Sequence, residues 1–202
     1  MNLKKIACFL IFLINFTLLF SQKSDQFPQI KKTSNGTWKF ENYGNGIIKT
    51  NFEPINAVDN EQVSNAVITK SFTGTPSGTK LSFNNSNKSI SYLFLNKELK
   101  LLEYFDSASY KGFRFKLSTD EKITGTGERS VPLNRRGYKL ALYNNPWYGY
   151  NVNADNLNYS VPFILSSNGY GIFFDNPSKG YFDIGLNNKN ILEYATTSGK
   201  LD

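Results

Sequence analysis

Histidine is absent from this chain of 202 residues, and its one cysteine, Cys8, lies in an apolar segment near the N-terminus. These absences exclude Ser-His-Asp and Cys-His catalysis, acid–base chemistry by histidine, and zinc sites built from cysteine and histidine. Asp-rich loops with the spacing of an EF-hand are also missing. We therefore expect neither a metal nor another cofactor.

Long apolar runs are missing too, apart from one over residues 6–20 that follows two lysines. This run is short for a segment that crosses a bilayer. A charged start, a short apolar stretch and a small residue at Ser21 are typical of a secretory signal. We predict that residues 1–21 are such a signal and that the protein is secreted or periplasmic, without membrane contact after cleavage. The alternative is an uncleaved N-terminal anchor.

The sequence also has no clusters of like charge. Lys4 and Lys5 would leave with the signal, so the 23 basic residues fall to 21 against 16 acidic ones and the net charge falls from +7 to +5. Lys31-Lys32 and Arg135-Arg136 are isolated pairs. A nucleic-acid-binding protein would carry a basic stripe together with a recognisable reader motif. We expect no nucleic-acid partner.

Short segments with β-strand character fill the rest of the chain, and no amphipathic helix of ten or more residues is found. The clearest segment, residues 111–117, places Phe113, Phe115 and Leu117 on one face and two basic residues on the other. Turn-forming residues such as Asn84–Asn87 and Ser166–Gly169 separate the segments. The other predicted strands are Thr37–Phe40, Ile47–Phe52, Val67–Phe72, Thr79–Phe83, Ser89–Leu95, Leu99–Tyr104, Lys139–Tyr143, Val161–Leu165, Tyr170–Phe174 and Ile191–Thr196.

This pattern predicts an all-β fold, a two-sheet antiparallel β-sandwich. Residues 22–202 are enough for one domain and too few for a sandwich joined to a (β/α)8 barrel. The predicted core contains Phe113, Phe115, Phe163, Phe173 and Phe182.

The last residues read as an incomplete hairpin. Ile191–Thr196 is a strand, Ser198-Gly199 its turn, and Lys200–Asp202 the opening of a return strand. An unfinished hairpin leaves an unpaired edge, which is unfavourable in a natural domain. We therefore expect a chain cut short, in the gene or in the recorded sequence.

The segment from Ile123 to Gly185 closely resembles glycoside hydrolase family 31. The similarity is colinear over about sixty residues, and upstream of Ile123 it is only general. The matching motifs are Gly125-Thr126-Gly127-Glu128-Arg129, Pro132-Leu133-Asn134-Arg135-Arg136-Gly137, Leu142-Tyr143-Asn144, Ser160-Val161-Pro162-Phe163, Gly169-Tyr170-Gly171-Ile172-Phe173-Phe174-Asp175-Asn176 and Tyr181-Phe182-Asp183-Ile184-Gly185.

In that family this region is a galactose-mutarotase-like β-sandwich at the N-terminus, which packs on a catalytic barrel and lends one loop to the mouth of the active site. The resemblance implies a parent enzyme that is a retaining α-glycoside hydrolase, most often an α-glucosidase. Its nucleophile and acid would lie in the barrel, which is absent here. We therefore expect no catalytic residue in this chain and no activity of the chain alone.

Residues 144–158 form the best candidate site, because flat aromatic rings alternate there with amide and carboxylate side chains. Rings cover the C–H faces of sugars, and amides or carboxylates bind their hydroxyls. The resemblance identifies this segment as the loop that contacts sugar beyond the scissile bond. The candidate substrate-binding residues are Asn144, Trp147, Tyr148 and Asp155, the last in place of an aspartate that many relatives carry where this chain has Pro146. The alternative is a loop that only docks on the barrel.

Other conspicuous residues are expected to be structural. Gly125 and Gly127 predict a turn, because no helical pattern follows them as it would in a phosphate-binding loop. Glu128 lacks a second carboxylate and is expected to bond backbone amides or a neighbouring arginine. Asp175 and Asp183 are expected to cap turns.

Three hypotheses remain for the function. The first is the N-terminal, non-catalytic domain of a secreted family 31 hydrolase, with α-linked oligosaccharide and the enzyme's own barrel as partners. The second is a stand-alone carbohydrate-binding module. The third is a structural sandwich unrelated to sugars.

Overall fold

The structure is a computed structural model that describes residues 26–55, 66–67, 70–74, 78–86 and 88–202. Thirteen β-strands run through these residues, and all of their pairings are antiparallel. The described residues contain no helix that could cross a membrane. The predicted secretory signal lies outside them. The all-β prediction is confirmed.

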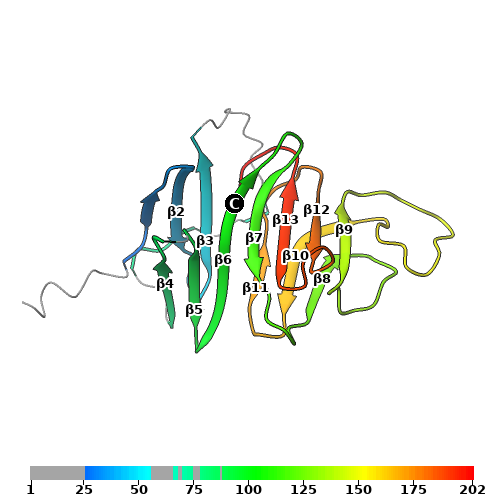
Figure 1. The fold of residues 1–202 in the computed structure, drawn as a ribbon, viewed down its shortest axis with the longest axis horizontal. Helices are drawn as coiled ribbons and strands as arrows, with labels where there is room; N and C mark the ends of the chain where they lie inside the picture. Colours follow the sequence, from blue (N-terminus) through cyan, green and yellow to red (C-terminus); the bar gives the residue numbers. More distant parts are fainter. Residues whose placement is uncertain (1–25, 56–65, 68–69, 75–77, 87) are drawn as a thin grey trace, which may run out of the picture.

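One layer of the molecule is a sheet of seven strands (Figure 1). β13 (Ile191–Thr196) pairs with β7 on one side and with β12 on the other. The C-terminal strand therefore lies inside the sheet and has no free edge. From one edge of the sheet to the other, the strands are β4 (Thr79–Phe83), β5 (Ile90–Phe94), β6 (Lys97–Asp106), β7 (Lys111–Lys116), β13, β12 (Gly180–Ile184) and β9 (Tyr138–Leu142).

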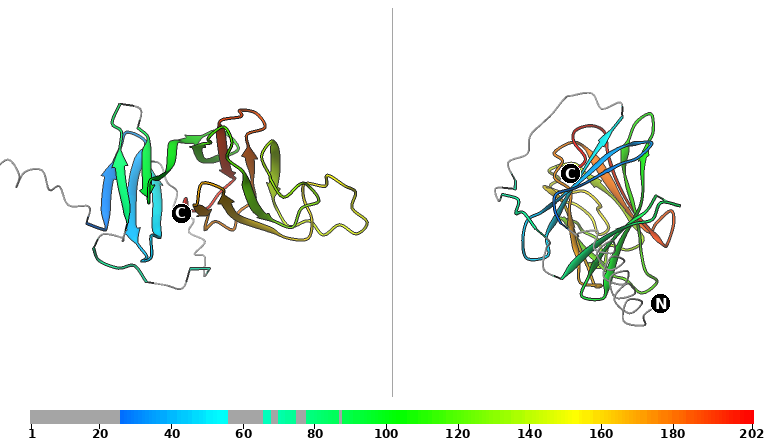
Figure 2. Two further views of the ribbon diagram at one scale, coloured as in Figure 1. Left: turned by 90° about the horizontal axis from the view of Figure 1, so that it is seen from below. Right: turned by 90° about the vertical axis from the view of Figure 1, so that its left-hand side faces the viewer.

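The opposite layer is divided into two sheets of three strands, which lie at opposite ends of the molecule (Figure 2). One contains β1 (Gln29–Lys32), β2 (Gly36–Asn42) and β3 (Ile48–Pro54). The other contains β8 (Ile123–Gly127), β10 (Ser160–Ser166) and β11 (Gly171–Phe173). The sandwich is thus continuous on one side and split on the other.

Aromatic rings join both small sheets to the large one. The ring of Trp38 in β2 lies 5.5 Å from that of Phe113 in β7. The ring of Phe174, just after β11, lies 6.0 Å from that of Phe115 and 3.9 Å from that of Tyr194. Such pairs bury large apolar areas and add a modest geometric preference. Burial is also the main cause that raises the pKa of the Tyr194 hydroxyl.

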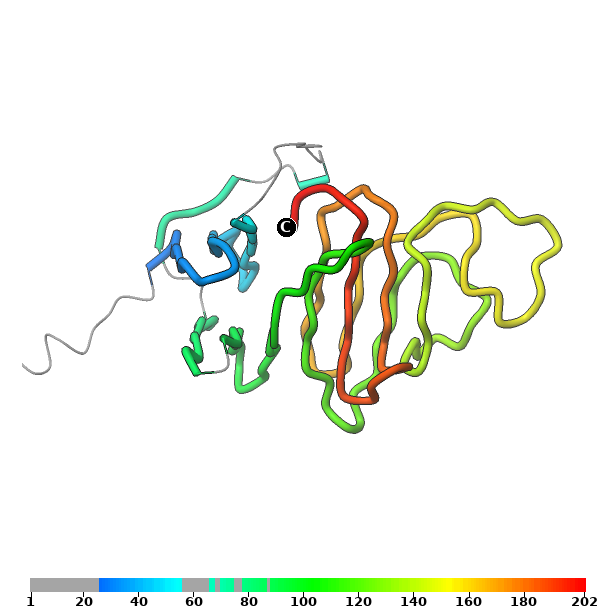
Figure 3. The backbone as a smooth tube through the Cα atoms, turned by 45° about the horizontal axis from the view of Figure 1, so that its top comes forward, coloured from blue at the N-terminus to red at the C-terminus, as the bar shows by residue number. Residues whose placement is uncertain are grey.

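The last residues of the chain fill the gap between the two small sheets (Figure 3). The backbone N–H of Phe52 in β3 donates to the carbonyl oxygen of Leu201 at 2.9 Å, and that of Asp175 donates to the carbonyl oxygen of Asp202 at 3.3 Å. Lys49 forms a salt bridge of 2.7 Å with the Asp202 carboxylate. The prediction that Lys200–Asp202 begins a return strand beside β13 is therefore wrong. Both edges of β13 are occupied, so the chain crosses to β3 instead.

The predicted core is confirmed for three phenylalanines and wrong for one. Phe113 and Phe115 are each 4% exposed and Phe182 is fully buried, whereas Phe173 is 40% exposed. Phe163 pairs with Phe173 across β10 and β11 and is partly exposed. Successive side chains of a strand point to opposite faces. Because Ile164 is buried, its neighbours Phe163 and Leu165 point outward. The segment Val161–Leu165 has apolar residues on both faces, so the sequence did not show which face is buried.

The strand β8 corrects a second prediction, because its glycines were expected in a turn. Gly125 has φ +102°, and a Cβ atom there would lie 2.5 Å from the carbonyl oxygen of Phe163. At Gly127 it would lie 2.6 Å from the backbone nitrogen of Val161. The glycines allow β10 to approach β8 closely, and the pairing changes register between Ser160 and Ile164.

Most other predicted strands match the structure within two residues at each end. The strand β1 was not predicted. The predicted strand Val67–Phe72 lies partly outside the described residues, and within them Phe72 forms only an isolated bridge with Asn42.

Candidate functional site

A long loop joins β9 to β10 and contains all four predicted binding residues. Two hydrogen bonds close its neck. The backbone N–H of Asn145 donates to the carbonyl oxygen of Leu157 at 3.0 Å, and that of Ser160 donates to the Asn144 side-chain oxygen at 2.7 Å. Leu157 is 1% exposed. The loop therefore leaves the sandwich from a fixed base.

The far part of the loop is held by the segment that follows β8. The backbone N–H of Ser130 donates to the carbonyl oxygen of Ala154 at 2.9 Å, and that of Asn153 donates to the carbonyl oxygen of Ser130 at 2.7 Å. Glu128 accepts the backbone N–H of Asn158 at 3.2 Å, as expected for a structural glutamate. The loop is consequently braced on two sides.

Arg129 lies beneath the loop and is only 8% exposed. Its Nη2 donates to the carbonyl oxygen of Ala141 at 2.6 Å and to the Ser160 hydroxyl at 3.0 Å, and its Nη1 donates to the Asn156 side-chain oxygen at 3.3 Å. Burial lowers the pKa of Arg129 to about 10, while the charge of Asp155 acts in the opposite direction. The guanidinium is therefore a buried cation that ties β9, β10 and the loop together.

The aromatic residues of the loop project into solvent. Trp147 is 45% exposed, Tyr148 94% and Tyr150 48%. Exposed rings on a braced loop are unusual, because large apolar side chains are normally covered. This surface is available to a sugar or to another protein domain.

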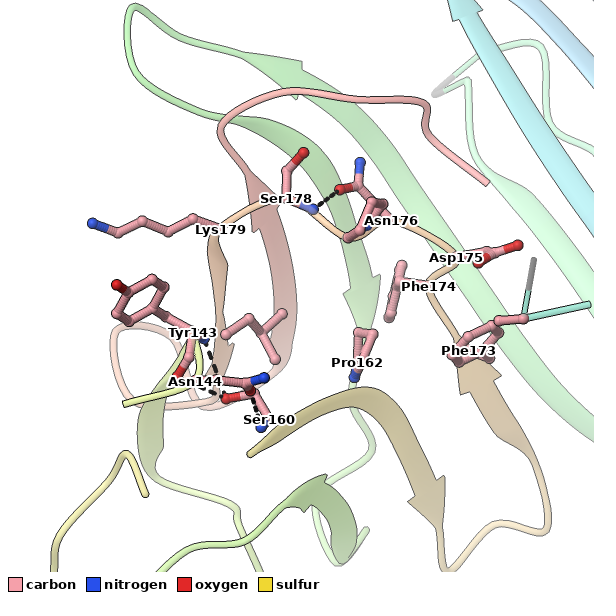
Figure 4. Close-up of a pocket in the computed structure, with 13 residues that line it drawn as sticks. Tyr143, Asn144, Ser160, Pro162, Phe173, Phe174, Asp175, Asn176, Ser178 and Lys179 are labelled. Atoms are coloured by element: carbon pink, nitrogen blue, oxygen red, sulfur yellow. Dashed lines mark hydrogen bonds between the residues drawn. The ribbon is translucent and has the colours of Figure 1, made fainter. Parts of the chain in front are cut away.

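A cavity of about 470 Å³ opens next to the base of the loop (Figure 4). Tyr143 and Asn144 line it from the end of β9, Pro162 from β10, and Phe173 from β11. Lys179 lies over the Tyr143 ring at 5.5 Å. A cavity of this size with aromatic and amide walls suits a small polar ligand such as a sugar.

The structure brings only one of the four predicted residues, Asn144, into this cavity. Trp147, Tyr148 and Asp155 lie elsewhere on the loop and do not line it. The Asn144 side-chain oxygen is already engaged by Ser160. Sequence reasoning missed Lys179, which carried no signal, and gave Tyr143 only as part of a matching motif.

Among the described residues, one carboxylate lines the cavity and another caps a nearby turn. Asp175 is the only acidic residue among the described residues that line the cavity, whereas glycoside hydrolysis needs two carboxylates across the bond. Asp183 accepts the backbone N–H of Leu186 at 2.8 Å, as predicted for a turn cap. Asp175 was also predicted to cap a turn, but after β11 this contact is made by its neighbour Asn176, which accepts the backbone N–H of Ser178 at 2.7 Å. The described residues also contain no cluster of three potential metal ligands.

Comparisons with known proteins give consistent results. The family model described as the glycosyl hydrolase 31 N-terminal galactose mutarotase-like domain matches residues 14–183. Alpha-xylosidase XylQ of Lactiplantibacillus pentosus is 29% identical over 93 residues, which are 46% of this chain and 12% of that protein. An alpha-xylosidase of Emericella nidulans is 32% identical over 77 residues, 38% of this chain and 9% of that protein. This chain therefore spans a small part of the curated relatives that it matches.

Solved structures show the same fold. A GH31 dextranase of Flavobacterium johnsoniae, in complex with isomaltotriose, superposes with a TM-score of 0.76 at 22% identity, over 86% of this chain and 25% of that chain. A GH31 alpha-xylosidase from a soil metagenome, in complex with xylose, has a TM-score of 0.60 at 19% identity, over 89% of this chain and 31% of that one.

Proposed function

Because the chain belongs to the family of glycosyl hydrolase 31 N-terminal galactose mutarotase-like domains, we propose that it is the non-catalytic sandwich of a secreted enzyme that hydrolyses α-glycosidic bonds. In this proposal the sandwich packs on a catalytic (β/α)8 barrel and places one loop at the mouth of the active site. The observation that carries the proposal is the braced, aromatic loop between β9 and β10, which lies beside a cavity. The apolar outer face of the sheet β8–β10–β11 lies next to this cavity.

The outer face of the sheet β8–β10–β11 is the proposed contact with the barrel. Val161, Leu165 and Phe173 are 38%, 50% and 40% exposed there. Leu165 and Phe173 lie on the face opposite the buried Ile164. Apolar patches that border polar residues mark interaction sites, because their burial is favourable. A barrel docked on this face would also cover part of the cavity.

The loop supplies the proposed sugar contacts. Rings of Trp147 and Tyr148 would cover the C–H face of a sugar, and Asp155 would accept a hydrogen bond from a hydroxyl. Asn144 would act at the rim of the cavity through its amide nitrogen. The bracing by Ser130 and Arg129 would reduce the entropy lost when the loop binds.

The proposed substrate is an α-linked oligosaccharide of glucose, as for an α-glucosidase. A second candidate is an α-xyloside, because both curated relatives described above are alpha-xylosidases. The two sugars differ by one hydroxymethyl group. Parallel assays of the complete enzyme with aryl α-glucoside and aryl α-xyloside would separate these candidates.

We predict that the purified chain alone does not hydrolyse aryl α-glycosides. The reason is that its cavity lacks the paired carboxylates of a glycosidase. The measurement is release of nitrophenol from aryl α-glucoside and α-xyloside, with the complete Flavobacterium johnsoniae dextranase assayed alongside as a family 31 enzyme. Turnover that persists after host glucosidases are removed would contradict the proposal. A fusion in which a matching barrel follows residue 202 should hydrolyse these substrates.

A second prediction concerns binding of sugar by the isolated chain. One loop offers only one wall of a site, so the dissociation constant for maltose or isomaltose should be roughly millimolar or weaker. Tryptophan fluorescence reports it, and Trp147→Phe should abolish the response while the buried Trp38 remains as an internal reference. A micromolar response that depends on Trp147 would instead favour the stand-alone carbohydrate-binding module.

A further inference from the structure

A second cavity, of about 210 Å³, lies at the other end of the molecule. It is formed where the turn between β1 and β2 meets the turn between β4 and β5. Figure 1 shows β2, β4 and β5 at one end of the molecule and β9, from which the candidate loop starts, at the other. The two cavities can therefore act independently.

Three lysines line this cavity, Lys31, Lys32 and Lys88. Two of them reach across it in opposite directions. The Lys31 ammonium donates to the Asn85 side-chain oxygen at 3.1 Å, and the Lys88 ammonium donates to the Ser34 hydroxyl at 2.9 Å. The two turns are thus linked by a reciprocal pair of hydrogen bonds that brings positive charges together.

The charge of these lysines is not balanced within the cavity. No acidic side chain is found among the described residues that line it, and the salt bridges of the described residues involve other cations. An ammonium group has three donors, and each of these hydrogen bonds uses only one. The cavity therefore holds several unused donors of one charge sign, which an anion would satisfy.

The remaining walls are suited to a sugar ring rather than to a bare ion. Phe83 offers partly exposed apolar surface beside the Lys31 ammonium, which lies 5.6 Å from its ring centre, and Asn84 and Thr33 are polar neutral residues. The cavity is several times the roughly 30 Å³ that one water molecule occupies, and smaller than the roughly 300 Å³ or more of pockets for larger ligands. One monosaccharide unit matches this range.

We propose that this lysine cavity binds an anionic sugar unit, in which the carboxylate of a uronate or a sulfate ester contacts Lys31 and Lys88. Such a site would attach the protein to acidic polysaccharide. It goes beyond the proposed function, because neither the barrel contact nor the candidate loop takes part in it. Loss of this site would leave hydrolysis of a neutral substrate unchanged.

The test is a titration of the purified Trp147→Phe chain with D-glucuronate, D-glucose 6-sulfate, D-glucose and sodium sulfate. Trp38 lines the cavity and reports binding by fluorescence, and calorimetry supplies a second measurement. We expect millimolar binding of both anionic sugars, weaker binding of free sulfate, and no response to glucose. Added sodium chloride should weaken the binding, because exposed charges are screened.

Lys31→Gln combined with Lys88→Gln should weaken binding of glucuronate by about tenfold, since each exposed charge contact contributes modestly. Lys80→Gln combined with Lys97→Gln is the matched control, which removes the same charge from exposed positions outside the cavity. If the double variant does not fold, the single variant Lys88→Gln, at an exposed position, provides the same test of glucuronate binding. Equal binding of glucose, equal binding of free sulfate, or an equal effect in the control would overturn the proposal.

Discussion

Replacement of Phe182 by alanine is expected to destabilise the fold by about 3–5 kcal/mol, the range for large aromatic side chains in cores. Phe182 is fully buried in β12, and its ring lies 5.5 Å from that of Phe174 and 5.6 Å from that of Tyr194. The strand is paired on both sides, so the surrounding backbone has little freedom to collapse into the cavity. The cost is a large share of the roughly 5–15 kcal/mol that stabilises a domain.

Urea unfolding followed by Trp38 fluorescence measures this effect. Phe173→Ala is the matched control, because the same side chain is removed from a neighbouring part of the fold where it is 40% exposed. We expect this variant to lose about 1 kcal/mol or less. Similar losses in the two variants would show that the assignment of inner and outer faces is wrong.

Replacement of Arg129 by methionine is expected to loosen the candidate loop and to cost about 3 kcal/mol. The side chain keeps a similar size, but Ala141, Ser160 and Asn156 each lose a donor. These acceptors are partly buried, and a buried acceptor left unsatisfied costs about 1–3 kcal/mol. Ser160 and Ala141 keep a weaker contact with each other at 3.4 Å, which limits the loss. Unfolding in urea gives the stability, and limited proteolysis between residues 145 and 157 reports the loop.

Lys122→Met is the control for this experiment, because it removes an exposed cation just before β8, the strand that Arg129 follows. Its stability and its cleavage pattern should match those of the unchanged chain. Proteolysis of the Arg129 variant that remains as slow as in the control would refute the role of Arg129 as the anchor of the loop. Faster cleavage together with weaker sugar binding would connect this buried cation to the proposed function.

The split of one layer into two small sheets has a consequence for the whole domain. Each small sheet covers a different part of the large sheet, and the short segment at Leu201 and Asp202 joins them by backbone hydrogen bonds and a salt bridge. Leu201 is 2% exposed, so this join is also packed into the core. The two ends of the sandwich are therefore linked through the last residues as well as through the continuous sheet.

The strand content, the family and the concentration of aromatic and amide residues in the loop after β9 could all be predicted from the sequence. These properties depend on local alternation, on turn-forming residues and on colinear motifs, all of which are visible along the chain. It also excluded chemistry by histidine, because the chain contains none. The tertiary structure was not needed for these conclusions.

The three-dimensional structure was needed to show which strand faces and which distant segments meet. Phe163 and Phe173 lie on outward positions of strands whose neighbours are also apolar, so composition could not assign their face. The strand β13 was recognised, but its insertion between β7 and β12 depends on pairing between residues far apart in the chain. The same is true of Arg129 beneath the loop and of the lysines that converge from β1 and from the turn between β4 and β5. Contacts made across the sandwich leave no pattern in the local sequence.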